Sequence, residues 1–335
     1  MKKFGKQIVQ SLVGGFLLPS ALLLLVLGAS AKSEPQQQPT GKPVTLPQQV
    51  TLATQPELPL FLPVQVDGEV VNWELEAYLV GVLLAEVPAG FEMETLKAQA
   101  VAARTYALKC HYKGYKHLGA ICVKSTCCQG YCSIEEYIQK GGTLTQVQKI
   151  QQAVSETKGE VLTYQGDLIE ATYFASSGGK TEDAKAVWGT EVPYLQSVES
   201  PEEEAISSHE QTIVLSVDAL SEALGIETDT EPEHWLGNIT YTNGGGVDLI
   251  EIDGVQYRGV TLRKLLQLRS TVFTISWDRD VFLITTRGYG HRVGMSQYGA
   301  EAMAMDGCDY LQILQHYYRG TQIAQYEKIT LEKTM

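Results

Sequence analysis

The sequence predicts an α+β fold of mixed helices and antiparallel strands, which follows an apolar N-terminal segment and a proline-rich spacer. From residue 64 to residue 325, helical stretches and hairpin-like strand patterns lack the regular alternation of a parallel sheet. Seven of the twelve prolines lie in residues 33–63, and residues 7–31 carry no charge. The chain therefore divides into a membrane anchor or signal (1–32), a linker (33–63) and a folded domain (64–325).

Composition and charge exclude other classes of protein. The 335 residues are 44% hydrophobic and 19% charged, which is typical of a globular chain. Lysine and arginine number 26 against 39 acidic residues, and three of the lysines fall in the first six residues. Nucleic acids bind to clustered cations, so the acidic folded domain is not expected to bind them.

The N-terminal segment predicts export. Its apolar run, Phe16 to Leu27, lies within an uncharged stretch that is long enough to cross ~30 Å of hydrocarbon as a helix. The stretch ends in Ala29-Ser30-Ala31, the small-x-small pattern of a cleavage site. We expect a single-pass membrane protein with its folded domain outside the cytoplasm. A cleaved signal is the alternative. The linker predicts an extended spacer.

The expected elements follow in order. A strand or hairpin at 64–71 precedes a helix that Asn72 caps and Pro88 ends. A second helix at 92–109 leads into a cysteine-rich loop, 110–132. The remaining periodic segments predict helices at 134–140, 144–158 and 310–318 and strands at 161–164, 168–175, 272–275 and 281–286. The acidic stretches 199–204 and 227–233 are expected to be loops.

Glu86 is the strongest candidate for a catalytic residue. It lies in an apolar run at the last turn of the predicted helix, two residues before Pro88. Burial raises the pKa of a carboxyl group, and the negative end of the helix dipole disfavours its anion. Both effects favour a protonated carboxyl near neutral pH, as a general acid requires. The alternative is a surface glutamate at the helix edge.

Two glycine-containing blocks lie downstream, at residues 173–182 and 287–300. The first resembles a phosphate loop, but Phe174 occupies the position of its first glycine. The second resembles a dinucleotide fingerprint, but Val293 occupies the position of the third glycine. Neither nucleotide motif is complete, so we expect no nucleotide site. The glycines of the second block would let backbone approach a ligand, or serve only the path of a turn.

Three blocks resemble the stage II sporulation protein D family, which also includes an amidase enhancer. They are Glu86-Val87-Pro88 with 96–106, then 176–182, then 290–300, in the order of the family. The resemblance implies a membrane-anchored lytic transglycosylase that cleaves MurNAc–GlcNAc bonds of peptide-stripped glycan strands during sporulation engulfment. The family's catalytic glutamate falls on Glu86, with no cofactor for catalysis.

The resemblance also bears on the substrate cleft. Arg292 stands where the family usually has glycine, and is expected to alter the cleft wall or its affinity for lactyl carboxylates. Lys97 and Arg104 share one helical face and are candidates for binding acetamido or lactyl groups, with a solvated face as the alternative. The other candidate substrate-binding residues are Tyr173, Ser176, Ser177, His291, Ser296, Gln297 and Tyr298. A structural role is the alternative for His291.

The cysteine-rich loop has two interpretations. Five of the six cysteines lie in residues 110–132, and an exported protein favours disulfides. The same spacing suits a tetrahedral zinc site. Relatives that hold zinc in this loop imply a structural zinc on His117, Cys122, Cys127 and Cys128, with Cys110 and Cys132 left to pair with each other.

Two functions of different class follow. One is the transglycosylase, which Glu86 favours, and the other is a non-catalytic glycan-binding enhancer of a cell-wall amidase. A cysteine hydrolase is disfavoured, because no cysteine begins a helix beside a histidine. The expected partners are peptidoglycan glycan strands, a cell-wall amidase or endopeptidase, and membrane proteins of an engulfment complex.

Overall fold

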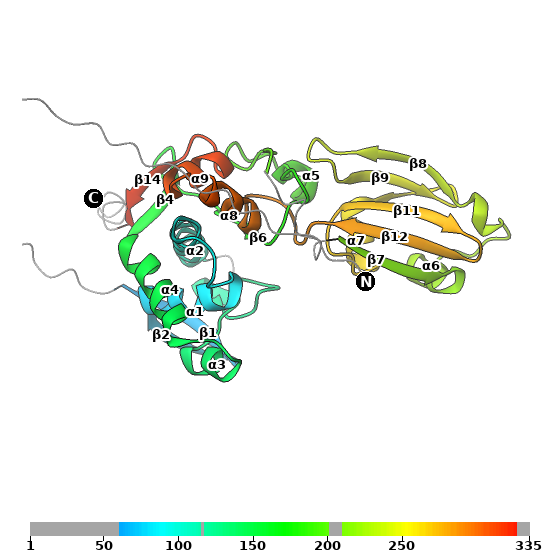
Figure 1. The fold of residues 1–335 in the computed structure, drawn as a ribbon. Coiled ribbons are helices and arrows are strands. Elements are labelled where there is room, and N and C mark those ends of the chain that lie inside the picture. Colours follow the sequence, from blue (N-terminus) through cyan, green and yellow to red (C-terminus); the bar gives the residue numbers. More distant parts are fainter. Residues whose placement is uncertain (1–59, 115–116, 201–209, 327–335) are drawn as a thin grey trace, which may run out of the picture. The chain divides into compact units, whose positions relative to one another are not determined.

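The described part of the chain begins with a β-hairpin. The computed structural model describes residues 60–114, 117–200 and 210–326 (Figure 1). The predicted anchor and most of the predicted linker lie outside these ranges. No helix within the described ranges is long and apolar enough to cross a membrane. β1 (Phe61–Val66) and β2 (Glu69–Glu74) confirm the predicted hairpin, which starts within the predicted linker.

Two helices follow the hairpin. α1 (Leu75–Glu86) begins at Glu74, whose carboxylate accepts the N–H of Ala77 at 2.6 Å. The prediction that Asn72 caps this helix is therefore wrong, because Asn72 lies within β2. α2 (Met93–Lys113) is confirmed and extends to Gly114, which adopts a left-handed conformation with φ 62°. Such a residue ends many helices, because glycine pays no steric cost there.

The cysteine-rich loop and two helices come next. The loop contains η1 (His117–Gly119) and β3 (Ile121–Cys122), which pairs with β1. α3 (Ile134–Gln139) and α4 (Leu144–Glu156) confirm the predicted helices. The predicted strand 168–175 is wrong as one element, because it divides into β5 (Asp167–Leu168) and β6 (Tyr173–Phe174). β4 (Glu160–Tyr164) pairs with β5 and with β14 (Gln322–Gln325).

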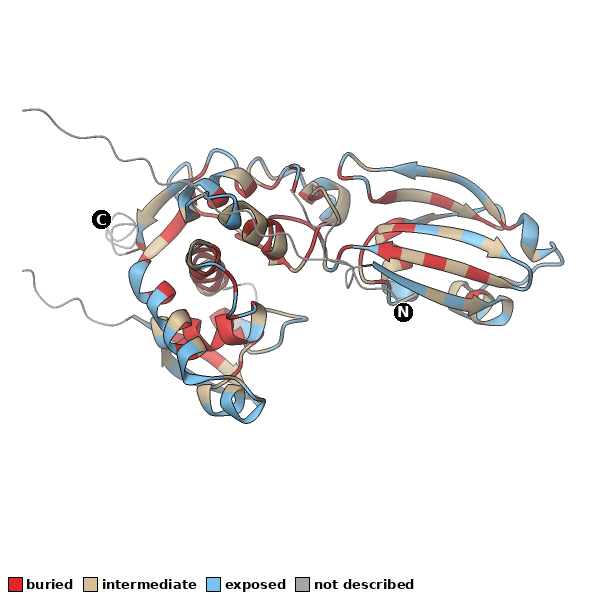
Figure 2. Cartoon of the chain, viewed as in Figure 1, coloured by how far each residue is buried: buried red, intermediate tan, exposed pale blue. Residues whose placement is uncertain are grey.

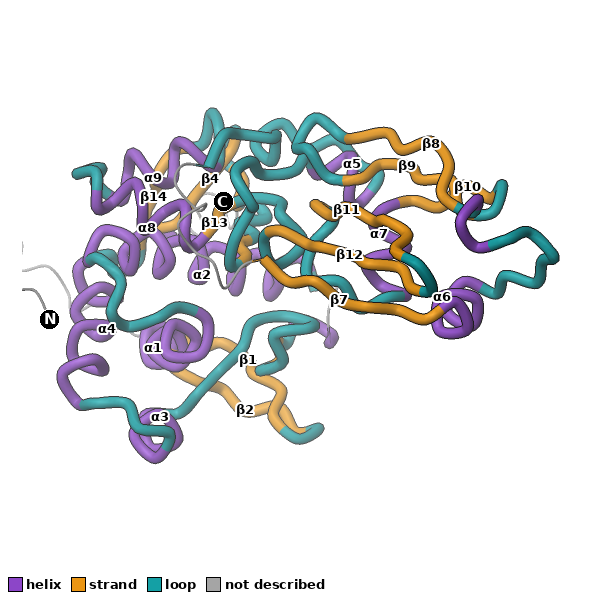
Figure 3. Tube along the Cα trace, turned by 45° about the vertical axis from the view of Figure 1, so that its right-hand side comes forward, coloured by secondary structure: helices purple, strands orange, loops and turns teal. Residues whose placement is uncertain are grey.

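Residues 210–287 form a separate core, which we call the β lobe. Only β11 (Val272–Asp278) and β12 (Val281–Arg287) were expected there. Together with β7 (Glu210–Ser216), which pairs with β12, they form one three-stranded antiparallel sheet. A second such sheet holds β8 (Leu236–Tyr241), β9 (Val247–Ile252) and β10 (Val255–Arg258) (Figure 3). Three short helical elements complete the lobe: α6 (Val217–Leu224), η4 (Pro232–His234) and α7 (Gly259–Leu265).

Of the remaining elements, α8 (Gln297–Met305) and α9 (Tyr310–Tyr317) pack against α2, and α5 (Ala184–Trp188) and β13 (Met295–Ser296) share their hydrophobic cluster. Side chains of α2 belong to two hydrophobic clusters, one shared with α1 and α4 and the other with α8 and α9. Its buried residues surround the helix on all sides (Figure 2). The mixed architecture confirms the predicted α+β class, with α2 as the centre of the part that carries Glu86.

Candidate active site

Glu86 is the last residue of α1. Its helix is buried along most of its length, and the backbone N–H of Val87 closes the last turn on Leu83 at 3.2 Å. The backbone N–H of Gly130, from the cysteine-rich loop, donates to Oε1 of Glu86. A Cβ atom at position 130 would lie 2.9 Å from that oxygen, so glycine permits this approach. The loop thus holds the carboxyl group in place.

The pKa of Glu86 is raised, as the sequence predicts. Burial is the larger cause, and the hydrogen bond from Gly130 opposes it without cancelling it. The C-terminal end of α1 also disfavours a negative charge. The side chain is only half-buried, so it can still reach a ligand. Glu86 can therefore donate a proton at a pH where an ordinary glutamate is already ionised.

Glu86 faces a groove of about 1070 Å³. Its walls come from the end of α1, Tyr106 of α2, the cysteine-rich loop, residues 172–175, residues 289–297, and α7 of the β lobe. Of the described residues in these walls, Glu86 alone carries a carboxyl group. The principal polar and aromatic lining residues are Tyr106, Ser125, Thr126, Tyr173, Phe174, Arg263, Lys264, Gln267, Tyr289, His291 and Gln297.

A buried glutamine connects the groove wall to α1 and α2. Gln129 donates its amide hydrogens to the hydroxyl of Tyr173 at 2.9 Å and to the carbonyl of Ala103 at 3.2 Å. Its oxygen accepts the hydroxyl of Tyr78 at 3.2 Å. Burial, followed by the charge of Glu86, raises the pKa of Tyr173, so its phenol stays neutral in the groove. Sequence reasoning missed Gln129, because a single polar residue in a loop carries no periodic signal.

His291 lines the groove as a neutral ring. Its Nδ1 accepts the backbone N–H of Val293 at 3.1 Å. Burial and the nearby charge of Arg263 lower its pKa to about 4, against the opposing effect of a hydrogen bond to the backbone of Tyr173. The ring is thus bonded to the backbone of the groove wall. His291 therefore fixes the turn of the wall, which supports the structural alternative over a direct bond to a sugar.

The cysteine-rich loop carries a cluster with the donor set of a zinc site. One donor atom from each of His117, Cys122, Cys127 and Cys128 lies within 4.8 Å of every other. The sulfurs of Cys127 and Cys128 are 3.9 Å apart, and Nε2 of His117 is 3.3 Å from the sulfur of Cys127. A tetrahedral zinc with ~2.3 Å bonds to sulfur places two sulfurs about 3.8 Å apart. The cluster therefore fits this metal.

The same thiols bear on the disulfide alternative. None of the six cysteines, all of which lie in the described residues, forms a disulfide in the structure. Cys110 and Cys132, which were expected to pair with each other, are both buried thiols. Cys128 lines the groove, and Gln129 and Gly130 follow it directly. A metal on this cluster would therefore hold the two residues that contact Tyr173 and Glu86.

Comparisons with known proteins cover most of the chain. The SpoIID family profile, described as Stage II sporulation protein, matches residues 67–164. Stage II sporulation protein D of Bacillus subtilis (strain 168) is 36% identical over 304 residues, which cover 89% of this chain and 87% of the relative. The protein of that name from Bacillus amyloliquefaciens is 36% identical over 277 residues, 80% of each chain.

The chain belongs to the stage II sporulation protein D family.

A third relative has a different description. An amidase enhancer of Bacillus subtilis (strain 168) is 30% identical over 301 residues, which cover 74% of this chain and 40% of the enhancer. This member of the stage II sporulation protein D family thus matches only a portion of the longer enhancer.

In this member of the stage II sporulation protein D family, Lys97 and Arg104 do not line the groove. Arg104 is fully buried in α2 and pairs with the carboxylate of Glu76 at 2.6 Å. Lys97 pairs with Glu94 at 2.9 Å and with Glu156 at 2.7 Å. We correct the expectation that these two cations bind sugar groups, because their charges are neutralised within the fold.

Replacing Arg104 by alanine is expected to destabilise the protein strongly. The change leaves Glu76 without its cation and removes hydrogen bonds to the carbonyls of Val154 and Glu160. Breaking one partner of a buried pair costs about 3–5 kcal/mol of unfolding free energy. Urea unfolding measures the change. Lys140→Ala is the control, because Lys140 pairs with Glu136 at an exposed site and should change stability far less. Equal effects of the two substitutions would contradict the buried role.

Four other predicted binding residues serve the fold of this family member. Ser176 and Ser177 are fully buried, and Ser296 caps α8 by accepting the N–H of Gly299 at 3.3 Å. The ring of Tyr298 packs edge-on against Phe91, with centroids 5.0 Å apart. None of the four lines the groove, so these assignments are corrected. Tyr173, His291 and Gln297 do line it, and Gln297 donates to the buried Gln99 at 3.3 Å.

The two downstream blocks lie side by side. Ser176 and Tyr289 exchange backbone hydrogen bonds of 3.0 and 2.8 Å, and β13 pairs with β6 in parallel. Gly294 has φ 87°, and a Cβ atom there would lie 2.0 Å from the carbonyl oxygen of Thr172. Only glycine fits this position. Gly294 therefore serves the contact between the two blocks, whereas Gly290 of the same block lines the groove.

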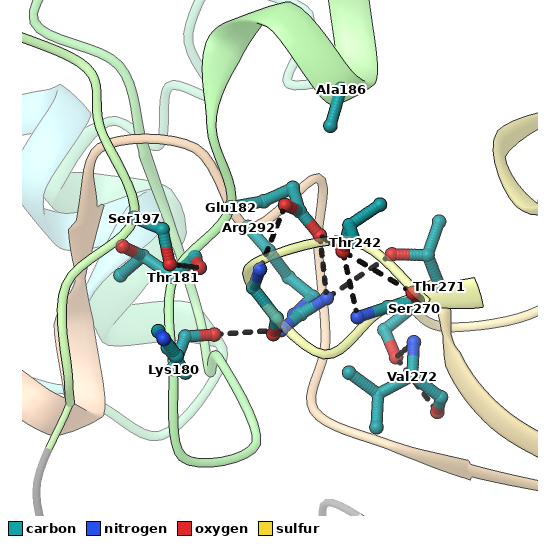
Figure 4. Close-up of polar contacts among 12 residues, drawn as sticks. Lys180, Thr181, Glu182, Ala186, Ser197, Thr242, Ser270, Thr271, Val272 and Arg292 are labelled. Atoms are coloured by element: carbon teal, nitrogen blue, oxygen red, sulfur yellow. Dashed lines mark hydrogen bonds and ion pairs between the residues drawn. The ribbon is translucent and has the colours of Figure 1, made fainter. Parts of the chain in front are cut away.

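Arg292, which replaces the usual glycine of the family, is also buried rather than exposed in the cleft. Its φ of 68° lies in the left-handed region that favours glycine. Its guanidinium pairs with Glu182 at 3.4 Å and donates hydrogen bonds to the carbonyl of Lys180 at 2.7 Å and the hydroxyl of Thr271 at 3.2 Å (Figure 4). Glu182 also accepts the hydroxyl of Thr242 at 2.6 Å. Because Thr242 and Thr271 belong to the β lobe, Arg292 holds the lobe and does not alter the cleft wall.

Proposed function

We propose that this protein is a peptidoglycan lytic transglycosylase with Glu86 as its single acid and base. The observation that carries the proposal is one half-buried carboxyl group of raised pKa in a groove lined by aromatic and polar side chains. Hydrolases of glycosidic bonds ordinarily use two carboxyl groups at a fixed separation. A lytic transglycosylase needs one, because the sugar supplies its own nucleophile.

The reaction follows from this arrangement. Protonated Glu86 gives its proton to the glycosidic oxygen between MurNAc and GlcNAc, and the bond from that oxygen to C1 breaks. The resulting carboxylate then takes the proton of the 6-hydroxyl of MurNAc as that oxygen bonds to C1. The product is a 1,6-anhydro ring, no water is consumed, and Glu86 ends protonated. The hydroxyl of Tyr173 and the amide of Gln297 supply polar groups along the wall.

We propose a structural role for zinc on His117, Cys122, Cys127 and Cys128. All four positions are protein side chains, so no open position is left for a reacting water. The metal would neutralise charge on the thiolates and fix the loop that carries Gln129 and Gly130. Catalysis itself then requires no cofactor.

The cellular setting is part of the proposal. Residues 1–32 would anchor the chain in the cell membrane, with the folded domain outside the cytoplasm and the linker between them. The substrate would be glycan strands without stem peptides, during sporulation engulfment. A cell-wall amidase or endopeptidase would remove those peptides. Membrane proteins of an engulfment complex would be further partners of the present protein.

Mass spectrometry of digested glycan tests the reaction. Purified peptide-free strands are incubated with the full-length chain, and their ends are analysed. We expect 1,6-anhydro-MurNAc ends in amounts that grow with time. Reducing ends without the anhydro ring would indicate hydrolysis instead, and unchanged strands would favour the alternative, a glycan-binding enhancer of an amidase like the relative of that description.

The pH profile reports the protonation state of Glu86. Because the acid form starts the reaction, kcat/KM is expected to fall as pH rises through the raised pKa of Glu86. His291 is neutral above about pH 4, and therefore does not produce this decline. Initial rates of anhydro-end formation, measured from acid to neutral pH, give the profile. A rate that increases through the same range would assign Glu86 the role of a base in the first step.

A further inference from the structure

The groove carries positive charge on the wall that the β lobe supplies. Arg263 and Lys264, both from α7, line it together with Gln267. The whole chain has a formal net charge of −13. The groove, by contrast, has two adjacent cations and one carboxyl group, and so carries a local excess of positive charge. The α7 wall lies in the lobe that Arg292 contacts through Thr271 and that its ion-pair partner Glu182 contacts through Thr242.

Arg263 has no acidic partner. Its Nε donates to the carbonyl of Arg269 at 3.3 Å, and no carboxylate of the described residues pairs with Arg263 or Lys264. Burial lowers the pKa of Arg263, yet its guanidinium remains charged at any pH of interest. The same charge depresses the pKa of His291 in the groove wall. A half-buried cation without a counter-ion is unfavourable, and an anionic ligand group would offset that cost.

We propose that Arg263, assisted by Lys264, is the specificity-determining residue of the groove and binds a carboxylate of the glycan. The inference rests on the proposed function. Each MurNAc carries a lactyl group that ends in a free carboxylate when no peptide is attached, and in a neutral amide when one is. A guanidinium fork matches a carboxylate in shape and charge. The α7 wall therefore selects strands from which an amide-cleaving enzyme has already removed the peptides.

Two chemically matched substrates test the proposal with the full-length chain. One is peptide-free glycan with free lactyl carboxylates, and the other is the same glycan with these groups converted to methylamides. Both binding, by calorimetry, and kcat/KM, by anhydro-end release, are measured. The wild-type chain is expected to prefer the free acid by about tenfold to a hundredfold, as for a charge-assisted hydrogen bond.

Variants assign the preference to α7. Arg263→Gln with Lys264→Gln is expected to lower affinity and kcat/KM for the free acid by that factor, and to leave the values for the amide unchanged. Arg263→Lys should restore part of the preference, because the charge remains without the fork. Arg279→Gln removes one exposed cation of the β lobe outside the groove and should change neither value. Thermal unfolding of each variant separates loss of fold from loss of binding.

The outcomes are distinct. The proposal is overturned if the double variant keeps the wild-type preference for the free acid. It is also overturned if the folded double variant loses affinity for the free-acid and the amide glycan equally. If the wild-type chain forms no anhydro ends from either glycan, the transglycosylase assignment fails. The difference in calorimetric affinity between the free-acid and amide glycans, compared for the wild-type chain and the double variant, then still decides whether Arg263 binds the carboxylate.

Discussion

Replacing Glu86 by glutamine is expected to reduce the formation of anhydro ends by at least ~10²-fold, the typical contribution of a general acid. Glutamine has almost the same shape, and its oxygen can still accept the N–H of Gly130. Its amide nitrogen cannot give a proton to the glycosidic oxygen. The fold, the metal content and the binding of glycan should therefore remain, while cleavage is lost.

The control for this substitution is Glu222→Gln. Glu222 lies exposed on α6 and does not line the groove, so its loss removes one carboxylate without touching the site. Rates of anhydro-end release are compared for the two variants and the wild-type chain. Activity of Glu86→Gln close to that of the wild type would remove Glu86 from the mechanism. A variant that still stimulates an amidase while inactive itself would support an additional enhancer role.

Replacing Cys122 by serine is expected to abolish stoichiometric zinc and to lower activity about 10²-fold. Cys122 is buried and supplies one of the four clustered donor atoms. Without the metal, the loop would no longer hold Gly130 against Glu86 or Gln129 against Tyr173. A displacement of ~1 Å at a catalytic group can cost this factor. Elemental analysis of protein purified without chelator, together with anhydro-end release, measures both effects.

Cys308→Ser is the matched control, since Cys308 is a free thiol outside the cluster. It should retain one zinc per chain and full activity. Titration of thiols in denatured protein distinguishes the alternative, because disulfides would leave fewer reactive thiols than six. A wild-type chain without zinc and with paired cysteines would overturn the metal proposal, whatever the activity of the variants.

The sequence predicted five of the described helices and missed α5, α6, α7 and α8. α1, α2, α3, α4 and α9 were all expected, because apolar periodicity, caps and prolines act over a few neighbouring residues. Within the β lobe, β7 to β10 were missed. Their partners lie across turns or far along the chain, and several of their residues are exposed, so the local pattern was weak.

The candidate site shows the same division. Glu86 was found because its whole signal is local: an apolar helix, its end, and a proline beyond it. The four clustered donors were also named, through the resemblance and their close spacing. Lys97 and Arg104 were assigned to the groove because they share a helical face, and spacing along a helix does not show what packs against that face.

The sequence by itself determined the family, the acidic residue at the end of α1 and the loop that holds the cysteines. Only the tertiary structure decided which other residues share the groove. Gln129 reaches Tyr173, and α7 brings Arg263 to the groove of Glu86 although 177 positions separate the two residues in the numbering. The physical reason is that a pattern reports the contacts a residue makes with its neighbours in the chain. Charge pairing, burial and access depend on the segments that fold against them.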